Sequence, residues 1–232
     1  IQAAKWGKNV YVIEKRPAVG GVTVHTGTIP SKTLRETVLN LSGWRERSFY
    51  GRAYRVKDDI TADDLKQRLN ITVTHEVDTM EHQFARNNVN IVYGAAHFVD
   101  ANTVEVEAAS GELQQFRADR ILIATGTHPF RPDYIPFDDE RIIDSDDILK
   151  LDHVPRSLTV IGAGVIGVEY ASIFAALDVN VTLVEPRDSM LDFIDEELIE
   201  EFTHKLRDSG VRLRFGQKVT NVRREGNTCV VE

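Results

Sequence analysis

Sulfur-containing residues are scarce in this sequence of 232 residues, which has one cysteine and two methionines. A single cysteine cannot form an internal disulfide, so the composition favours a reducing cytoplasm as the compartment. The cysteine is Cys229, which lies in the strand-like segment 228–231. We expect it to be a small buried apolar residue rather than a reactive thiol.

Long apolar runs and excess positive charge are also missing. No segment approaches the ~18 apolar residues typical of a membrane-spanning helix, and the first residues do not resemble a signal peptide. The formal net charge is −8, which is unfavourable for binding nucleic acid or an anionic membrane. The seven histidines show no metal-ligand spacing. Nucleic acid, membrane and metal are therefore not expected as partners.

Two segments of the sequence repeat one pattern, a short apolar strand that ends in an acid. They are residues 9–16 (NVYVIEKR) and 180–187 (NVTLVEPR), and their acids are Glu14 and Glu185. In a dinucleotide-binding βαβ unit, such an acid accepts hydrogen bonds from a ribose diol, about 20 residues after a glycine-rich phosphate turn. Two acids in this position predict two bound nucleotides.

The second copy of the pattern is complete. An apolar strand (158–161), the turn GAGVIG (162–167) and a helical pattern (168–177) precede its acid. Glycines in this turn permit a tight bend, a close approach to pyrophosphate and close packing of helix on strand. A merely structural glycine turn is the alternative, which the full context disfavours. The cofactor contacts expected here are Gly162, Gly164, Val165, Ile166, Gly167 and Glu185.

The first copy lacks its glycine turn, which by the same spacing would fall roughly nine residues before Ile1. We therefore expect the chain to begin inside a helix whose last turn contains Ala3, Ala4 and Trp6, with Gly7 as its C-cap. An ordinary helix–strand pair over residues 1–16 is the alternative.

Between these copies the sequence predicts further elements. Residues 32–41 continue a helix from Pro30, 42–59 are expected as a loop, and Thr61 with Asp64 forms a capping box. The helix that follows carries an apolar stripe expected in the core; its members are Leu65, Leu69, Val73, Val77, Met80 and Phe84. Strands are expected at 89–93, 103–106 and 120–124, and a proline-rich loop with Pro129, Pro132 and Pro136 follows them.

Residues 19–32 (VGGVTVHTGTIPSK) resemble the segment after the flavin-ribose strand of the flavoprotein disulfide reductases, GG-x-C-x-x-x-x-C-x-P-S-K. Thr23 and Thr28 stand at the two cysteine positions. Threonine cannot relay electrons from flavin to a disulfide, so dihydrolipoamide, glutathione and mercuric reductase activities are excluded. His25 and residues 27–32 resemble the soluble pyridine nucleotide transhydrogenase branch, from which Thr23 departs at that branch's remaining cysteine.

Three further segments resemble the same family in the same order, namely 93–98 (YGAAHF), 121–126 (ILIATG) and 143–149 (IDSDDIL). They resemble the turn beside the flavin adenine, the strand beside the isoalloxazine, and the crossing between domains. The resemblance implies a set of residues that bind the cofactor, either at the FAD site or at the crossing between the domains. They are Glu14, Lys15, Gly20, Gly21, Thr23, Thr28, Lys32, Ala95, Ala96, Ala124, Thr125, Gly126 and Ser145.

The resemblance implies an α/β fold class with two Rossmann-like, three-layer ββα domains, both incomplete. Residues 1–150 would be an FAD-binding domain without its first strand and GxGxxG turn, and 151–232 an NAD(P)-binding domain incomplete at its C-terminus. The family's dimerisation domain would lie beyond residue 232, so the full-length protein is expected to be a homo-oligomer. We expect residues 1–232 alone to retain FAD weakly or not at all, and to be inactive.

The resemblance also implies catalytic residues. Lys32 and Glu169 would form an ion pair beside the flavin and the nicotinamide, although two unrelated surface charges are the alternative. His25 would lie near the flavin. With no thiol relay, reduced flavin would return its hydride to a second nicotinamide, which is FAD-dependent transhydrogenation from NADPH to NAD⁺. Arg187, a cation near Glu185, would help to admit the 2′-phosphate of NADP; a plain surface arginine is the alternative.

Two other functions stay open at this point. One is a reductase that passes electrons from flavin to a quinone, oxygen or a protein. The other is a non-catalytic nucleotide-binding module. Both would use the same nucleotide segments, so the sequence does not separate them from a transhydrogenase.

Overall fold

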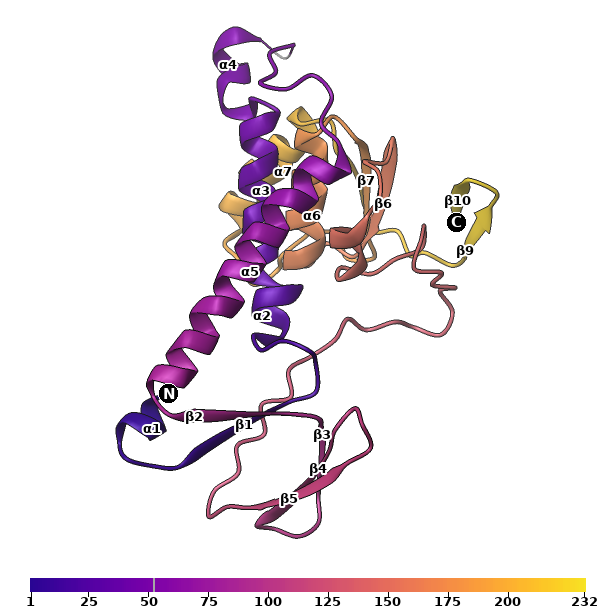
Figure 1. Cartoon of the computed structure of the whole chain (residues 1–232). Coiled ribbons are helices and arrows are strands. Elements are labelled where there is room, and N and C mark those ends of the chain that lie inside the picture. Colours follow the sequence, from indigo (N-terminus) through magenta and orange to yellow (C-terminus); the bar gives the residue numbers. More distant parts are fainter. Residues whose placement is uncertain (52) are drawn as a thin grey trace. The chain divides into compact units, whose positions relative to one another are not determined.

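The computed structural model describes residues 1–51 and 53–232, and no peptide bond among them is cis. Its backbone forms two compact units (Figure 1). The first unit contains residues 1–29 and 71–128, and the second contains residues 30–70 and 129–232. These two units are defined by which residues pack together. The predicted division at residue 150 instead separates FAD-binding from NAD(P)-binding residues, and it stays a prediction.

The first unit is built on two small sheets. Strands β1 (Val10–Glu14) and β2 (Val89–Tyr93) pair in parallel, with Val10 opposite Val89 and Glu14 opposite Tyr93. An antiparallel meander follows, formed by β3 (Ala95–Phe98), β4 (Thr103–Glu107) and β5 (Leu113–Arg117). Its helical segments are α1 (Gln2–Lys5), α2 (Gly21–His25) and the part of α5 (Ala62–Arg86) from residue 71 onward. The C-cap of α1 is Trp6, one residue before the predicted Gly7, and Gly7 follows it in a left-handed conformation with φ of 75°.

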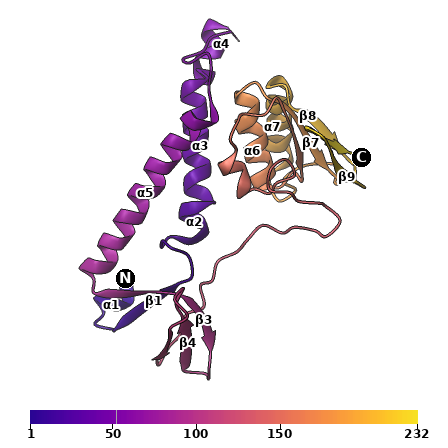
Figure 2. The same ribbon diagram turned by 45° about the vertical axis from the view of Figure 1, so that its right-hand side comes forward.

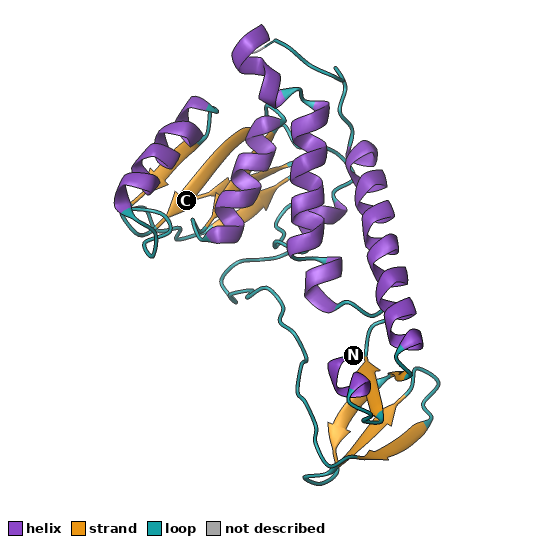
Figure 3. Ribbon diagram, turned by 90° about the vertical axis from the view of Figure 1, so that its left-hand side faces the viewer, coloured by secondary structure: helices purple, strands orange, loops and turns teal. Residues whose placement is uncertain are grey.

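The second unit is built around a parallel sheet in the order β6–β7–β8, whose strands span Ser157–Ile161, Asn180–Glu185 and Arg212–Phe215. Helices α6 (Val165–Ala176) and α7 (Glu196–Asp208) connect successive strands. Because right-handed crossovers that step in one direction along a sheet place their helices on one face, α6 and α7 cover the same side of the strands (Figures 2 and 3). This β6–α6–β7 unit is the complete copy predicted from the sequence.

Helix α6 is apolar around most of its circumference, which is typical of a helix buried on several sides. Its buried residues include Val168, Ile173 and Phe174. They share one core with Leu34 and Val38 of α3 (Thr28–Leu41) and with side chains from the start of α5 (Ala62–Arg86). This core fixes the first turn of α6, where the glycine turn ends.

Several predictions of local structure are confirmed. Helix α3 includes Pro30 in its first turn, where a missing N–H costs no helical hydrogen bond. The capping box before α5 is present, since Asp64 accepts from the Thr61 N–H at 2.9 Å and donates its own N–H to Thr61 Oγ1 at 3.3 Å. The α5 stripe is confirmed only in part. Leu65 and Leu69 are buried, whereas the other four members are half-buried.

The stretch 42–59 was predicted as a loop, and that prediction is wrong for part of it. A 3₁₀ turn (Trp44–Glu46) and helix α4 (Arg47–Tyr50) form there. Arg47 is buried and donates two hydrogen bonds to Asp178, at 3.0 and 3.1 Å. Its guanidinium also lies 5.2 Å from the Trp44 ring centroid. A partner far away in the sequence therefore stabilises these short helices. Residue 52 lies outside the described residues.

The predicted strand at 120–124 is not formed. This segment has no regular secondary structure, and Leu122 and Ile123 are 89% and 69% exposed. A strand requires a neighbour that accepts and donates its backbone hydrogen bonds, and none of the described strands pairs with these residues. An apolar run by itself therefore did not determine a strand here.

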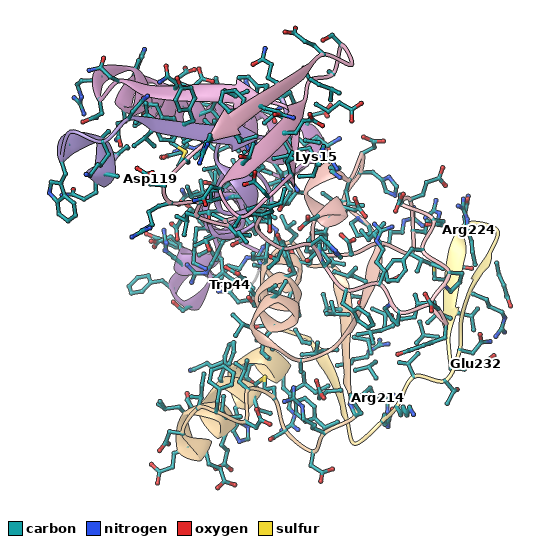
Figure 4. The ribbon with its side chains drawn as sticks, turned by 90° about the horizontal axis from the view of Figure 1, so that it is seen from below. Lys15, Trp44, Asp119, Arg214, Arg224 and Glu232 are labelled. Carbon is teal, nitrogen blue, oxygen red and sulfur yellow. The ribbon has the colours of Figure 1, made fainter. Side chains whose placement is uncertain are left out.

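The prediction that Cys229 is buried is also wrong, because its side chain is exposed. It lies in a two-stranded hairpin of β9 (Val222–Glu225) and β10 (Thr228–Val231); Figure 4 labels Arg224 and Glu232 on this hairpin. A two-stranded hairpin leaves much of its surface open to solvent. Arg224 connects it to a loop far earlier in the sequence through ion pairs with Asp138 and Glu140 at 3.0 and 2.7 Å.

Candidate nucleotide-binding site

The glycine turn lies between the end of β6 and the first residue of α6. Gly162 donates its N–H to the Val184 carbonyl at 2.8 Å, which fixes the turn against β7. A Cβ on Gly167 would lie only 2.0 Å from the Gly162 carbonyl oxygen. Only glycine fits there, because helix and turn are in direct backbone contact.

The first turn of α6 offers free donors. No side chain caps this helix, so the N–H groups of its first turn have no partner within the helix and point toward its N-terminal end. A Cβ on Gly164 would meet nothing within 4 Å, and the neighbouring side chains Val165 and Ile166 are 59% and 56% exposed. An open backbone cradle with a positive helix end fits a pyrophosphate.

Glu185 ends β7 beside this turn and is 4% exposed. Its Oε2 accepts from the Ala163 N–H at 2.7 Å, and its Oε1 accepts from the Arg187 N–H at 3.2 Å. The Arg187 side chain, together with these two N–H groups, lowers the pKa of Glu185 to about 2, although burial opposes the shift. Glu185 is therefore a carboxylate at neutral pH, the form that accepts hydrogen bonds, and in this structure its two oxygens already accept from the protein's own donors.

Arg187 binds Glu185 directly. Its Nε donates to Oε1 at 2.9 Å and its Nη2 to Oε2 at 3.3 Å. Its Nη1 donates to Asp192 Oδ2 at 3.0 Å. The two acids raise the pKa of Arg187, with Glu185 the larger influence. Asp192 was not identified from the sequence; the available signal was an acid in the loop that follows the predicted ribose-binding residue.

Lys32 and Glu169 form the ion pair that the resemblance implied. Lys32 Nζ lies 2.6 Å from Glu169 Oε1, and the side chains are 61% and 18% exposed. Lys32 is on α3 and Glu169 on α6, both within the second unit. The geometry excludes the alternative of two unrelated surface charges. Their role beside a flavin stays a proposal.

In the first unit, Glu14 ends β1 as Glu185 ends β7. Its Oε1 accepts the Arg16 N–H at 2.9 Å, which repeats the contact between Glu185 and the Arg187 N–H. Glu14 is half-buried, and no other hydrogen bond to its carboxylate occurs among the described residues. Lys15, which follows it, is exposed. The remaining acceptor positions of Glu14 fit a ribose diol.

The segment after β1 turns tightly at two glycines. Gly20 has φ of 120°, and a Cβ on it would lie 2.7 Å from Val24 Cβ, so the start of α2 requires glycine. Gly21 begins α2, and Thr23 is exposed on it. His25 Nε2 lies 2.9 Å from the Val19 carbonyl oxygen. A carbonyl only accepts, so Nε2 carries the proton and Nδ1 is the nitrogen left for other contacts.

The other predicted FAD residues occupy several elements. Thr28 is the first residue of α3, and Ala95 and Ala96 open β3. The run Ala124, Thr125 and Gly126 is exposed and irregular. Ser145 lies inside a turn where Asp144 Oδ1 accepts the N–H groups of Asp146 and Asp147, at 2.8 and 3.3 Å.

Arg131, which was not identified from the sequence, holds this turn in place. It forms ion pairs with Asp139, Asp144 and Asp147, the pair with Asp144 at 2.7 Å. Burial pushes the pKa of Asp144 upward, but the Arg131 guanidinium and the two turn N–H groups lower it overall. One arginine therefore orders the loop that carries Ser145.

Metal-binding clusters and membrane-spanning helices are both absent from the described residues. These residues contain no group of three or more His, Cys, Asp or Glu arranged to hold a metal ion. None of their helices combines the length and the apolar character needed to cross a bilayer.

Comparison with known proteins gives a consistent result over the full sequence. The family described as "Pyridine nucleotide-disulphide oxidoreductase" matches residues 1–232. A protein of Mycobacterium bovis named "Soluble pyridine nucleotide transhydrogenase" is 51% identical over 223 residues, which are 96% of this chain and 48% of that protein. A protein of the same name from Colwellia psychrerythraea is 38% identical over 98% of this chain and 49% of its own length. The chain thus spans about half the length of these relatives.

Solved structures share the fold. LpdA from Mycobacterium tuberculosis matches 99% of this chain and 50% of its own, with a TM-score of 0.88 at 24% identity. The HOCl-induced flavoprotein disulfide reductase RclA from Escherichia coli matches 100% of this chain and 49% of its own, with a TM-score of 0.83 at 25% identity. The predicted fold class, Rossmann-like nucleotide-binding α/β architecture, is confirmed.

Proposed function

Because this chain belongs to the pyridine nucleotide-disulphide oxidoreductase family, we propose that the full-length protein is an FAD-dependent, Si-specific NAD(P)⁺ transhydrogenase. It would move hydride from NADPH to NAD⁺ without a redox disulfide. The observation that carries the proposal is the presence of Thr23 and Thr28 where the reductases have their cysteine pair. The names of the relatives that cover nearly the whole chain support it.

In this proposal the second unit binds NADPH and NAD⁺ in turn. The first turn of α6 holds the pyrophosphate through its backbone N–H groups, with Gly164 leaving room for close approach. Glu185 accepts hydrogen bonds from the hydroxyls of the adenosine ribose. Glu14 plays the corresponding part for FAD in the first unit.

Bound FAD would supply the hydride acceptor and donor that no side chain of this sequence provides. Lys32, held by Glu169 at 2.6 Å, would supply a positive charge that stabilises negative charge on a reduced flavin ring. His25, with its proton on Nε2, keeps the segment that follows β1 fixed through Val19. Two nicotinamides would use the site in alternation.

We further propose that the protein works in the cytoplasm, in line with its single cysteine. The full-length protein would be a homo-oligomer, which is what the family resemblance implies. Its partners would be nicotinamide nucleotides.

The test uses the full-length protein with NADPH and thio-NAD⁺, followed at the absorbance of the reduced analogue. We expect reduction of thio-NAD⁺ that depends on bound FAD. Consumption of NADPH only when a quinone or oxygen is supplied would instead identify a reductase. A flavin that stays oxidised under NADPH would leave a nucleotide-binding module without catalysis.

A further inference from the structure

The carboxylate of Glu185 has no acceptor position left for a nucleotide. Two carboxylate oxygens offer about four lone-pair positions. Oε1 accepts from the Arg187 N–H and Nε at 3.2 and 2.9 Å, and Oε2 accepts from the Ala163 N–H and Arg187 Nη2 at 2.7 and 3.3 Å. The ribose hydroxyls must therefore displace a donor.

Only the Arg187 side chain can leave without disturbing the fold. The Ala163 and Arg187 N–H groups are backbone donors fixed by the glycine turn and by the end of β7. The Arg187 side chain is 47% exposed and sits on a long flexible stem. Glu185 is buried and cannot move away. Binding of a ribose diol thus requires the guanidinium to withdraw from Glu185.

Asp192 is positioned to receive it. Its Oδ2 already accepts from Arg187 Nη1 at 3.0 Å, on the side of the guanidinium away from Glu185 Oε1. The loop that carries Asp192 is anchored by the buried side chains of Met190 and Leu191, and Leu191 has φ of 50°. Asp192 itself is 59% exposed. A fixed backbone therefore presents a carboxylate next to a mobile cation.

We propose that Asp192 is a specificity-determining residue, which selects between NAD(H) and NADP(H) by competing for Arg187. This inference rests on the proposed function only in assigning nucleotide binding to Glu185. When the 2′-hydroxyl is free, Asp192 retains Arg187 and leaves Glu185 open to the ribose. When a 2′-phosphate is present, the phosphate takes Arg187, and Asp192 loses its ion pair and repels the phosphate. Asp192 therefore shifts selection toward NAD(H).

The experiment measures binding to the oxidised, FAD-containing, full-length protein, so that no turnover is involved. The probes are ADP-ribose and 2′-phospho-ADP-ribose, which lack the nicotinamide ring, titrated by calorimetry. Asp192→Asn should raise the affinity for the phosphorylated probe relative to ADP-ribose by about three- to tenfold, as expected for loss of an exposed ion pair and of one repulsive charge. Asp192→Glu should keep the wild-type ratio within about twofold.

Two controls fix the mechanism. In an Arg187→Ala background, Asp192→Asn should shift the ratio by a clearly smaller factor, because the competition for Arg187 is gone and only the repulsion between Asp192 and the phosphate remains. Glu201→Gln, which removes one acid from an exposed pair on α7, should leave the ratio unchanged. If Asp192→Asn does not fold, Asp192→Ser replaces it in both binding measurements.

An unchanged ratio in the Asp192 variants would overturn the inference, and so would an equal shift in the Arg187→Ala background. Failure of the proposed function is distinguishable from either result. A wild-type protein that binds both probes but reduces no thio-NAD⁺ leaves the selectivity measurement intact.

Discussion

Lys32 and Glu169 are 137 residues apart in the sequence, and their side chains meet at 2.6 Å between Nζ and Oε1. The pair joins the helix after the threonine-containing segment to the helix after the glycine turn. Glu169 is the less exposed partner, at 18% against 61%. A half-exposed ion pair of this kind contributes little to the free energy of unfolding. We therefore expect its role to be functional, through the positive charge that Lys32 presents.

Replacement of Lys32 by methionine should slow flavin reduction by NADPH roughly a hundredfold in the full-length protein, because a positioned charge at a site of developing negative charge is worth about that factor. The flavin midpoint potential should fall as well. Stopped-flow absorbance and redox titration measure the two effects. Lys66→Met, which breaks the ion pair with Asp152, is the matched control and should change neither quantity. If both variants slowed flavin reduction equally, Lys32 would have no special role in that step.

Two glycines of the turn between β6 and α6 should respond differently to the same substitution. Gly167→Ala places a Cβ 2.0 Å from the Gly162 carbonyl oxygen, and we expect it to lower the free energy of unfolding by about 1–3 kcal/mol. Gly164→Ala meets no atom within 4 Å, so the fold should be retained while ADP-ribose binding weakens. Urea unfolding and calorimetry distinguish these outcomes. A stable Gly167→Ala variant with normal binding would contradict the close contact of helix and turn.

The pH dependence of stability should report Glu185. Its pKa is lowered from 4.5 to about 2 in the folded protein, so its contribution to stability is present above pH 4.5 and is lost as the pH falls toward 2. The difference in melting temperature between wild type and Glu185→Gln should therefore shrink over that interval. Thermal unfolding from pH 7 downward, at constant ionic strength, measures it. A difference that does not vary with pH would mean that Glu185 has an ordinary pKa.

Loss of Arg47 should destabilise the second unit. Its two hydrogen bonds to Asp178 come from a side chain that is 7% exposed, and we expect Arg47→Met to cost about 1.5–3 kcal/mol of unfolding free energy. Arg35→Met breaks the more exposed ion pair with Glu36 and should cost less than about 0.5 kcal/mol. Urea denaturation of both variants measures the difference. Comparable values would show that burial of Arg47 does not strengthen its contacts.

Much of the fold could be predicted because the signals are local. Alternating or continuous apolar runs predicted β1, β2, β4, β6 and β7, and helical spacing with a capping box predicted α5. Elements with a weaker sequence pattern could not be predicted in this way. Strand β5 has mostly exposed side chains and the sequence LQQFR, so it shows no clear apolar alternation, and its pairing with β4 forms it instead.

The candidate site shows the same division. The glycine turn and Glu185 could be identified from spacing, because a βαβ unit places both at one end of a parallel sheet. The ion pair of Lys32 and Glu169 followed from family resemblance and not from any local pattern. The contacts of Arg187 with Asp192, and of Arg131 with three acids, could not be predicted, since several acids lie near each arginine in the sequence.

The sequence by itself determined the glycine turn between β6 and α6, the acids that end β1 and β7, and the absence of a thiol pair, because each depends on residue type and short spacing. The tertiary structure alone decided whether an apolar run such as 120–124 pairs as a strand, whether Cys229 is buried, and which acid Arg187 contacts. These outcomes depend on neighbours that are distant in the chain, and a backbone donor or a charged side chain is stabilised only where such a neighbour supplies the partner.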